Sequence, residues 1–418
     1  MTGPAIPSKL KCGLLGKTLG HSFSPLIHSR LFDYRYDLYE KEPEEVADFL
    51  KNGDYDGLNV TIPYKKTAYA LCDEVSPAAE KTGSVNTVLR LQNGLLKGYN
   101  TDYFGFSYLV RKAGFEVSGK KVLVLGSGGA SGTVCAVLKD LGAGKIVVVS
   151  RTGADNYSNL GTLHSDARYL INTTPVGMYP NNGSTPLDLR CLPHCAGVID
   201  LIYNPAKTKL LLDAESAGMI AVNGLSMLTA QAKQSCEIFT GVKIGDEAIE
   251  TIAREIEANT KNIILIGMPG CGKSTVGANL AKRLGRPFID IDNKIEDRIR
   301  MSICEFFKRH GEQAFRDIET EALAEYSKQS GQIIATGGGI VTIPRNLPLM
   351  KQNGTIVMLN RPLHELPVAG RPISMSCDLV RLEKDRLPIY KAWKDISVKS
   401  GNPEETTRSI IAHLIPQS

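Results

Sequence analysis

The residue types and spacing that could hold a phosphate group occur in nine consecutive residues, 267–275. They fit the pattern G-x-x-x-x-G-K-[ST], in which backbone N–H groups curl around a phosphate. Lys273 would reach the β- and γ-phosphates, and the Ser274 hydroxyl would hold Mg²⁺. We therefore expect a bound nucleoside triphosphate, with these contacts: Gly270, Cys271, Gly272, Lys273, Ser274 and Thr275.

A strand before this loop and a helix after it must position these groups. Residues 262–266 form a mainly apolar run directly before the loop, and Val276, Leu280 and Leu284 recur at helical spacing after it. The local pattern therefore predicts a strand, a glycine-rich turn and a helix.

A second nucleotide motif lies far upstream, between a predicted strand at 121–125 and a predicted helix. It resembles the dinucleotide-binding fingerprint of Rossmann domains. The next strand ends at Arg151, which would attract a 2′-phosphate where a carboxylate would repel it. The motif therefore predicts NADP in preference to NAD, with these contacts: Gly126, Gly128, Gly129, Ala130, Ser150, Arg151 and Thr152.

Composition limits the classes of partner and compartment. The 418 residues carry a net charge of +5, and no Lys/Arg block is interleaved with aromatic residues, so we expect no nucleic-acid partner. Nine cysteines, an odd number without a C-x-x-C pair, indicate free thiols in a reducing cytoplasm. No apolar run has the length of a secretory signal or a membrane span, and we expect a cytoplasmic protein.

Short strand-like runs alternate with helical segments along the whole chain, which predicts an α/β fold. A helical pattern at 246–259 precedes the phosphate-loop strand, so two domains meet at about residue 260. The buried strands are predicted at 11–15, 57–61, 121–125, 145–149, 197–200, 262–266, 332–335 and 355–359.

Further motifs join the dinucleotide site in the first half, at 20–28, 59–65, 83–87, 98–105 and 224–231. Together they resemble the shikimate dehydrogenase family over about residues 9–258. The resemblance implies that Ser22 and Ser24 hold the substrate carboxylate and that Lys65 and Asp102 form the catalytic pair. It also implies ring-hydroxyl contacts from Asn59, Thr61, Asn86 and Gln231, and nicotinamide-side contacts from Tyr203 and Gly224.

The chemistry of these residues agrees with that resemblance. A small polyhydroxylated acid needs many neutral hydrogen-bond partners. Reduction of a ketone by hydride requires a proton for the developing alkoxide, which an ammonium beside a carboxylate can supply. Taken singly, Lys65 could be a surface helix lysine and Asp102 a helix N-cap.

The residues after the phosphate loop resemble shikimate kinase over about 261–415, through motifs at 288–292, 305–319, 336–339, 370–372 and 385–390. We expect residues 288–292 to form a strand that ends in two carboxylates. The resemblance implies that Asp292 positions or deprotonates the attacking hydroxyl and that Asp290 supports Mg²⁺ through water. It also implies a carboxylate clamp of Arg316 and Arg386, backbone contacts at Gly337, Gly338 and Gly339, and Arg371 on a lid over the phosphates.

Two arginines on one carboxylate would give planar bidentate recognition. The alternative for Arg316 is a helix salt bridge with Glu312 or Glu319.

Two segments depart from the family patterns. Residues 151–171 are too short for a full crossover, which predicts a Rossmann sheet trimmed on its adenosine side. The stretch 359–371 is shorter than the usual helix before the lid.

The expected architecture is a dehydrogenase-like substrate domain at 1–104, to which 224–258 returns, a Rossmann NADP domain at 105–223 and a P-loop kinase-like domain at 261–418. The resemblances imply that NADPH reduces 3-dehydroshikimate to shikimate, and that ATP with Mg²⁺ then phosphorylates shikimate. Three alternatives stay open: a sensor of shikimate-like acids without turnover, an NAD-dependent quinate or quinate/shikimate dehydrogenase, and a chain with one active half and one scaffold half.

Overall fold

The structure is a computed structural model that describes residues 10–20, 22–366 and 379–414. Backbone contacts divide the chain into two compact units. The first comprises Met1–Pro175, Pro186–Tyr203 and Asp213–Glu255, and the second comprises Val176–Thr185, Asn204–Leu212 and Ile256–Ser418.

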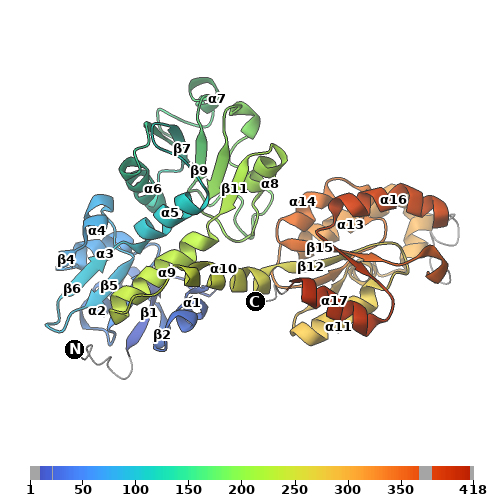
Figure 1. The fold of residues 1–418 in the computed structure, drawn as a ribbon, viewed down its shortest axis with the longest axis horizontal. Coiled ribbons are helices and arrows are strands. Elements are labelled where there is room, and N and C mark those ends of the chain that lie inside the picture. The colour runs from blue at the N-terminus through green and yellow to red at the C-terminus, as the bar shows by residue number, and fades with distance from the viewer. Residues whose placement is uncertain (1–9, 21, 367–378, 415–418) are drawn as a thin grey trace. The chain divides into compact units, whose positions relative to one another are not determined.

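The first unit contains a six-stranded mixed sheet in the order β2-β1-β3-β5-β6-β4 (Figure 1). Its strands are β1 (Lys11–Gly16), β2 (Arg35–Glu40), β3 (Gly57–Val60), β4 (Glu74–Val75), β5 (Thr87–Arg90) and β6 (Leu96–Tyr99). β3 and β5 are antiparallel, with Asn59 opposite Thr87. The end of β3 and the start of β5 therefore bring polar residues of two motifs side by side.

Helices flank this sheet and supply further site residues. Helix α9 packs against α1 and α5, which brings residues more than 100 positions apart in sequence into contact. The side chain of Asn100 caps α5 by accepting a hydrogen bond from the backbone N–H of Tyr103. The helices are α1 (Ser24–Leu31), α2 (Pro43–Asn52), α3 (Lys65–Leu71), α4 (Pro77–Thr82), α5 (Thr101–Lys112), α9 (Leu225–Thr240) and α10 (Glu247–Thr260).

A second, wholly parallel sheet has the order β11-β10-β9-β7-β8. Its strands are β7 (Lys121–Leu125), β8 (Lys145–Val149), β9 (Tyr169–Asn172), β10 (Gly197–Asp200) and β11 (Ile220–Asn223). The order reverses at β7, since β8 lies on one side of it and β9 on the other. Ligands of open α/β sheets bind in the crevice at such a switch point.

Strand β8 is the edge strand of this sheet. Its connection to β9 contains one single-turn helix and no strand. This confirms the predicted trimming of the sheet on that side. The other helical elements around the sheet are α6 (Gly129–Asp140), α7 (Leu160–Leu163), the 3₁₀ turn η1 (Leu189–Cys191) and α8 (Lys209–Ser216).

The second unit contains a third sheet, again wholly parallel, in the order β13-β14-β12-β15-β16. Its strands are β12 (Asn262–Ile266), β13 (Phe288–Asp290), β14 (Ile333–Ala335), β15 (Gly354–Asn360) and β16 (Ile396–Lys399). Figure 1 shows α13, α14 and α16 on one side of this sheet and α11 and α17 on the other. The doubly wound arrangement confirms the predicted α/β class.

The helices of the second unit include one irregular element, α13, which is interrupted at Gly311 with φ 81°. Its helical elements are α11 (Lys273–Leu284), α12 (Ile291–Ile299), α13 (Ile303–Ser327), η2 (Ile340–Thr342), α14 (Asn346–Lys351), η3 (Leu363–Glu365), α16 (Leu379–Trp393) and α17 (Pro403–Leu414).

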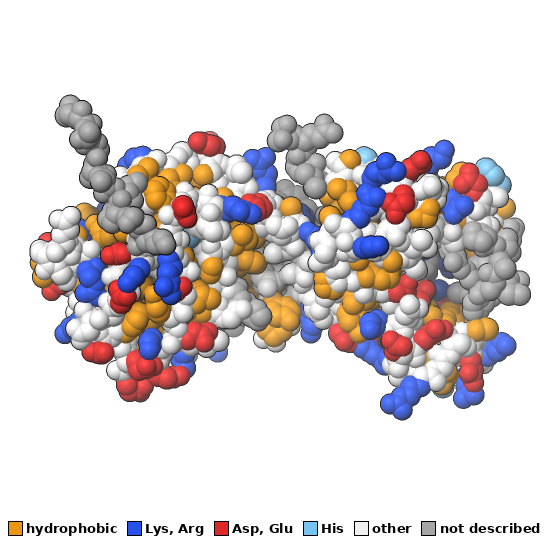
Figure 2. Space-filling view, turned by 90° about the horizontal axis from the view of Figure 1, so that it is seen from below, with side chains coloured by type: hydrophobic (Ala, Val, Ile, Leu, Met, Phe, Trp, Pro, Cys, Tyr) orange, Lys and Arg blue, Asp and Glu red, His pale blue; other side chains and the backbone are white. Residues whose placement is uncertain are grey.

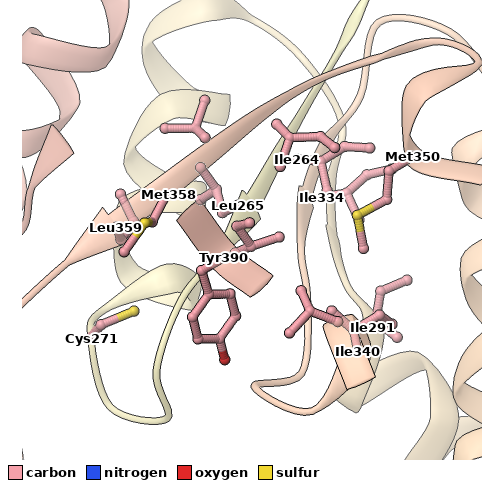
Figure 3. Packing of buried hydrophobic residues seen from close by; sticks show 14 of the residues in the cluster. Ile264, Leu265, Cys271, Ile291, Ile334, Ile340, Met350, Met358, Leu359 and Tyr390 are labelled. Carbon is pink, nitrogen blue, oxygen red and sulfur yellow. The ribbon is translucent and has the colours of Figure 1, made fainter. Parts of the chain in front are cut away.

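The core of the second unit lies between its central strands and the helices that cover them. Ile264 and Leu265 of β12 are fully buried, together with Ile334 of β14 (Figure 3). Strands that are covered on both faces have continuous apolar runs in the sequence, and the sequence therefore predicts them well. Tyr390 of α16 is also fully buried beside them.

All eight strands predicted from the sequence are present, with ends within one residue of the prediction. The expected strand at 288–292 was wrong in its last part. The strand ends at Asp290, and helix α12 begins at Ile291. The physical reason is capping, because the Asp290 carboxylate accepts hydrogen bonds from the backbone N–H groups of Asp292 and Asn293 and so starts a helix.

Charged side chains of both signs lie on the surface. Figure 2 shows Lys and Arg side chains intermixed with Asp and Glu side chains on the face that it presents. Among the described residues, no helix combines the length and the apolar character needed to cross a bilayer. All eight described cysteines are free thiols.

Candidate active sites

In the first unit, Lys65 and Asp102 form an ion pair, with Lys65 Nζ 2.6 Å from Asp102 Oδ2. Lys65 opens α3 and Asp102 lies in the first turn of α5. Their side chains are 29% and 18% exposed, so the pair is accessible but partly removed from water. An ammonium in this setting can give a proton to a bound carbonyl oxygen while the carboxylate stabilises its charge.

Three of the amide residues expected to bind the substrate lie together. Asn59 and Asn86 are 5% and 3% exposed. Asn86 Nδ2 is 3.4 Å from Gln231 Oε1, which joins the start of β5 to helix α9. The structure thus gathers side chains of three separate motifs, as a site for a polyhydroxylated ligand requires.

The expected carboxylate ligands are at the start of α1. Ser24 is the first residue of this helix and is 7% exposed, and its backbone N–H donates to Ser22 Oγ at 3.2 Å. Thr61 directly follows β3, with its backbone N–H bonded to the carbonyl of Leu15 at 2.9 Å. These three hydroxyls come from segments next to β1 and β3.

Sequence reasoning missed a layer of hydroxyls beneath the amides. Thr87, Thr101 and Ser235 are at most 1% exposed. Asn59 Nδ2 donates to Ser235 Oγ at 2.8 Å and to Thr87 Oγ1 at 3.1 Å. Thr87 and Thr101 stand next to the motif residues Asn86 and Asp102, but Ser235 carries no local signal because its partners are distant in sequence.

The dinucleotide motif lies at the switch point of the parallel sheet. Gly126 follows β7 with φ 98°, and a Cβ there would lie 2.9 Å from Thr174 Cγ2 and 3.0 Å from Thr173 Oγ1. Only glycine suits this close approach. Gly128 caps α6, and a Cβ added at Gly128 or Gly129 would meet open space. The start of α6 therefore offers backbone N–H groups to a pyrophosphate.

Arg151 and Thr152 are exposed at the end of β8, after Ser150. Ser150 N–H donates to the carbonyl of Asp155 at 3.1 Å, which folds the loop back on itself. The carboxylate of Asp155 pairs with His164 Nε2 at 2.6 Å. The guanidinium of Arg151 is thus exposed on a loop that folds back on itself.

Tyr203 and Gly224, expected near the nicotinamide, follow β10 and β11. Burial raises the pKa of the Tyr203 phenol, and its ring lies 6.0 Å from that of Phe23. Gly224 caps α9, and a Cβ there would be 2.1 Å from the carbonyl oxygen of Leu201. Ala130 lies in the first turn of α6, beside the glycines.

In the second unit, Lys273 opens α11 and is 8% exposed. Its ammonium donates to the backbone carbonyls of Gly267 at 2.9 Å and Met268 at 3.1 Å. The phosphate loop therefore holds its own lysine. Ser400 also braces the loop, because its hydroxyl donates to the carbonyl of Cys271 at 2.6 Å.

Ser274 Oγ donates to Asp290 Oδ2 at 2.6 Å. These hydroxyl and carboxylate oxygens fit a hard cation such as Mg²⁺, which prefers oxygen ligands and keeps several waters. Within the described part of the chain, no group of three or more His, Cys, Asp and Glu side chains could enclose a metal. Thr275 is exposed on the same helix.

Arg316 is buried at 3% exposure and pairs with two carboxylates of its own helix. Its Nη1 is 2.7 Å from Glu319 Oε2, and its Nη2 is 3.0 Å from Glu312 Oε1. The salt bridges of the alternative interpretation are therefore present. They hold the guanidinium against Gly339, where an added Cβ would lie 2.2 Å from both of its Nη atoms.

Glu319 is fully buried, and sequence reasoning gave it no role of its own. Burial raises its pKa to about 7, although the Arg316 charge acts in the opposite direction. Glu319 Oε1 and Asp292 Oδ1 both approach Gly337, where a Cβ would lie 2.4 and 2.8 Å from them. Burial, with the charge of Asp290 as the second cause, raises the pKa of Asp292. A carboxyl with a raised pKa is a better proton acceptor.

Arg386 of α16 is 6% exposed, and its Nη1 donates to the carbonyl of Gly338 at 3.1 Å. The Tyr390 hydroxyl donates to the same carbonyl at 2.5 Å. The segment 337–339 therefore receives both predicted clamp arginines. Arg371 lies outside the described residues.

Comparison with known proteins divides the chain in the same way. A family model described as the shikimate dehydrogenase substrate binding domain matches residues 14–88. A model described as shikimate kinase matches residues 269–415. The matches include Asn59, Lys65 and Asn86 in the first part and Lys273 in the second.

Relatives and solved structures agree for the first unit. Shikimate dehydrogenase (NADP(+)) of Clostridium perfringens strain SM101 is 36% identical over 266 residues, covering 59% of this chain and 97% of that protein. A chorismate mutase/shikimate 5-dehydrogenase fusion protein from Clostridium acetobutylicum is 36% identical, with a TM-score of 0.57 over 60% of this chain and 98% of that one. Shikimate 5-dehydrogenase from Thermus thermophilus, solved with shikimate, is 31% identical, with a TM-score of 0.53 over 59% and 98%.

Proposed function

Because this chain belongs to the shikimate dehydrogenase family and carries a shikimate kinase domain, we propose that one polypeptide catalyses two consecutive reactions. The first reduces 3-dehydroshikimate to shikimate with NADPH. The second transfers the γ-phosphoryl group of ATP to shikimate. We assign the substrate domain to 1–104 with 224–258, the NADP domain to 105–223 and the kinase domain to 261–418.

The observation that carries the dehydrogenase assignment is the Lys65–Asp102 pair, together with the buried amides of Asn59 and Asn86. NADPH, when bound, would supply a hydride to the ketone carbon. Lys65 Nζ gives its proton to the ketone oxygen, which becomes the new hydroxyl, and Asp102 stabilises the ammonium before the transfer. Ser22 and Ser24 orient the carboxylate, and the amides of Asn59, Asn86 and Gln231 orient the ring.

For the kinase, the supporting observation is the convergence of Asp292, Arg316 and Arg386 on residues 337–339. The two arginines bind the substrate carboxylate, and Asp292 orients the attacking hydroxyl and accepts its proton. Lys273 turns from its loop carbonyls to the phosphates. Ser274, with Asp290 through water, would hold the Mg²⁺ that neutralises charge on those phosphates.

A one-pot assay tests both steps on the purified full chain. It contains 3-dehydroshikimate, NADPH and Mg-ATP, and follows NADPH consumption together with the masses of the products. We expect shikimate from NADPH alone and shikimate 3-phosphate only when ATP is added. Replacing NADPH by NADH, and 3-dehydroshikimate by 3-dehydroquinate, tests the quinate alternative.

The negative outcomes are equally specific. Accumulation of shikimate in the presence of ATP would leave one active half and one scaffold half. Binding of shikimate without consumption of NADPH would favour a sensor of shikimate-like acids. Either result would contradict the two-step proposal.

A further inference from the structure

We propose that His164 is a positioning residue of the cofactor site. Its hydrogen bond to Asp155 holds the turn at 150–155 in the shape that presents Arg151 and Thr152 to a 2′-phosphate. The inference rests on the proposed function, in which NADPH is the reductant. It adds a residue that determines cofactor specificity through the turn, from a side chain that is itself buried.

The turn lies in a connection with little regular structure. β8 ends at Val149 and β9 begins at Tyr169, and the segment between them consists of the single-turn helix α7 together with turns, bends and irregular chain. The crossover between parallel strands usually contains a longer helix, whose packing fixes the chain that leads into it. Arg151 and Thr152, which are both exposed, therefore need another support.

The turn closes on itself between Ser150 and Asp155. The backbone N–H of Ser150 donates to the carbonyl of Asp155 at 3.1 Å, which joins the two ends of the turn that carries Arg151. Gly153 packs inside this turn, since a Cβ there would lie 2.7 Å from Ser150 Oγ and 3.2 Å from the Asp155 carbonyl oxygen. The position of Asp155 therefore sets the position of the turn.

Two asparagines shape the chain that follows the turn. Asn159 Oδ1 accepts from the backbone N–H of Asn156 at 2.9 Å, and Asn156 Oδ1 accepts from the backbone N–H of Asn159 at 3.2 Å. Asn159 Nδ2 also donates to the carbonyl of Ala154 at 2.8 Å. All three bonds lie within residues 154–159, so they shape this segment without attaching the turn to the sheet.

His164 provides the attachment. It caps α7, and its backbone N–H donates to the carbonyl of Leu160 at 2.9 Å, while its own carbonyl accepts from the backbone N–H of Ala167 at 3.0 Å. Leu160 and Ala167 are at most 1% exposed, so the backbone of His164 is anchored in the interior. From this position, His164 Nε2 lies 2.6 Å from Asp155 Oδ1. The bond therefore connects an anchored residue to the turn.

The burial of the imidazole makes this bond expensive to break. A carboxylate only accepts, so His164 Nε2 donates to Asp155. The other ring nitrogen, Nδ1, is buried and has no hydrogen-bond partner among the described residues. The imidazole is 6% exposed and the carboxylate 38%, so water can replace His164 at Asp155 more easily than it can replace Asp155 at His164. An opened turn would leave a buried N–H unpaired, and the closed turn is therefore favoured.

Two matched pairs of substitutions in the full chain test this role. His164→Leu removes the donor nitrogen, whereas His164→Gln keeps an N–H donor at a similar reach. Asp155→Ala removes the acceptor, whereas Asp155→Asn removes the same charge but keeps an acceptor oxygen. Because the Asp155 side chain is 38% exposed, the second pair tests the bond without opening a buried cavity, even if His164→Leu fails to fold.

Initial rates of 3-dehydroshikimate reduction give the KM for NADPH and for NADH. Competitive inhibition against NADPH by adenosine 2′,5′-bisphosphate, which carries the 2′-phosphate but no nicotinamide, gives its Ki. We expect His164→Leu and Asp155→Ala to raise the KM for NADPH and this Ki about fivefold relative to His164→Gln and Asp155→Asn, as for one lost hydrogen bond. The kcat with NADPH and the KM for NADH should stay within about twofold, which a general loss of structure would not allow.

The opposite results separate this inference from the proposed function. Equal increases in KM for NADPH and NADH, or equal constants within each pair of variants, would overturn the positioning role of His164 and leave the dehydrogenase assignment intact. A wild-type protein that consumes no NADPH with 3-dehydroshikimate would instead overturn the proposed function.

Discussion

Around Lys65 the first unit gathers neutral amides and hydroxyls, whereas around Lys273 the second unit gathers charged side chains. In the first site, buried hydrogen bonds fix the neutral groups: the Asn59 amide donates to the Ser235 hydroxyl, and the backbone N–H of Thr101 donates to the Asn86 amide oxygen. In the second, internal acceptors hold each cation. Lys273 bonds to carbonyls of its own loop, and Arg316 bonds to Glu319.

The difference follows from the ligands that the two sites would bind. The neutral ring hydroxyls that the first site would bind are recognised by the direction of many hydrogen bonds, so the directions must be set in advance. The phosphates that the second site would bind are recognised by charge, and a buried cation without a partner would cost several kcal/mol in the empty protein. The second site therefore folds with its charges paired internally, and its ligands must replace those partners.

Removal of Lys65 should have the largest effect and should abolish the activity of the first site only. We expect Lys65→Ala to lower kcat of the reductase by about 10³-fold or more, because the proton donor is lost, and to leave kinase activity unchanged. Steady-state rates of both reactions measure this. Lys66→Ala, at the adjacent exposed lysine, is the control. Loss of both activities in a folded Lys65→Ala protein would contradict independent sites.

A substitution in the phosphate loop should have the reverse effect and lower only the kinase activity. Lys273→Ala should reduce kinase kcat by about 10²-fold to about 10³-fold, since one charge that stabilises the transferred phosphoryl group is removed. Reductase activity should stay at the wild-type level. Lys282→Ala, on the same helix but exposed, is the matched control. A kinase that retains its rate without Lys273 would exclude the loop as the nucleotide site.

The buried charge of Glu319 gives a pH test of the second unit. Its pKa is raised from 4.5 to about 7 on folding, so its contribution to stability is complete below pH 4.5 and is lost as the pH rises to 7. Glu319→Gln does not titrate. The free energy of unfolding of Glu319→Gln relative to wild type should therefore increase from pH 4.5 to 7, by up to about 3 kcal/mol.

The single tryptophan makes this measurable in the whole protein. Trp393 is 8% exposed in the second unit, and its fluorescence reports unfolding there. Urea titrations at several pH values give the difference, and the exposed Glu321→Gln on α13 is the control. Parallel stability curves for wild type and Glu319→Gln would show that the carboxyl titrates normally.

The smallest effect is expected at the cofactor loop. Arg151→Ala should raise the KM for NADPH about tenfold or more and leave the KM for NADH within about twofold, because only the 2′-phosphate contact is lost. Initial rates with each cofactor decide this. Lys145→Ala, at the other end of β8, should change neither value. Equal losses with both cofactors would contradict a role in 2′-phosphate recognition.

Local pattern was sufficient for the α/β class and for eight of the strands. The central strands could be predicted because parallel strands covered on both faces are continuous apolar runs, as at residues 262–266. The phosphate loop could be recognised because its residues are consecutive. The start of α12 could not, because one capping side chain, Asp290, decided between strand and helix.

The parts of the sites that sequence could not supply depend on contacts across long separations. Thr87 and Ser235 are 148 positions apart, and their hydroxyl oxygens lie 2.8 Å from each other. No spacing rule within a single sequence joins them. Glu319 was recognised only as a possible salt-bridge partner, since its complete burial comes from the packing of the whole unit.

The close approach of side chains to residues 337–339 limits how this chain can vary. A methyl group at Gly339 would overlap the guanidinium of Arg316, and one at Gly337 would overlap the carboxylates of Glu319 and Asp292. Even alanine, the smallest replacement, therefore displaces a buried charge. In a library of random variants selected for kinase activity, these two codons should stay glycine, while Ala278, exposed on α11, has steric room for other residues.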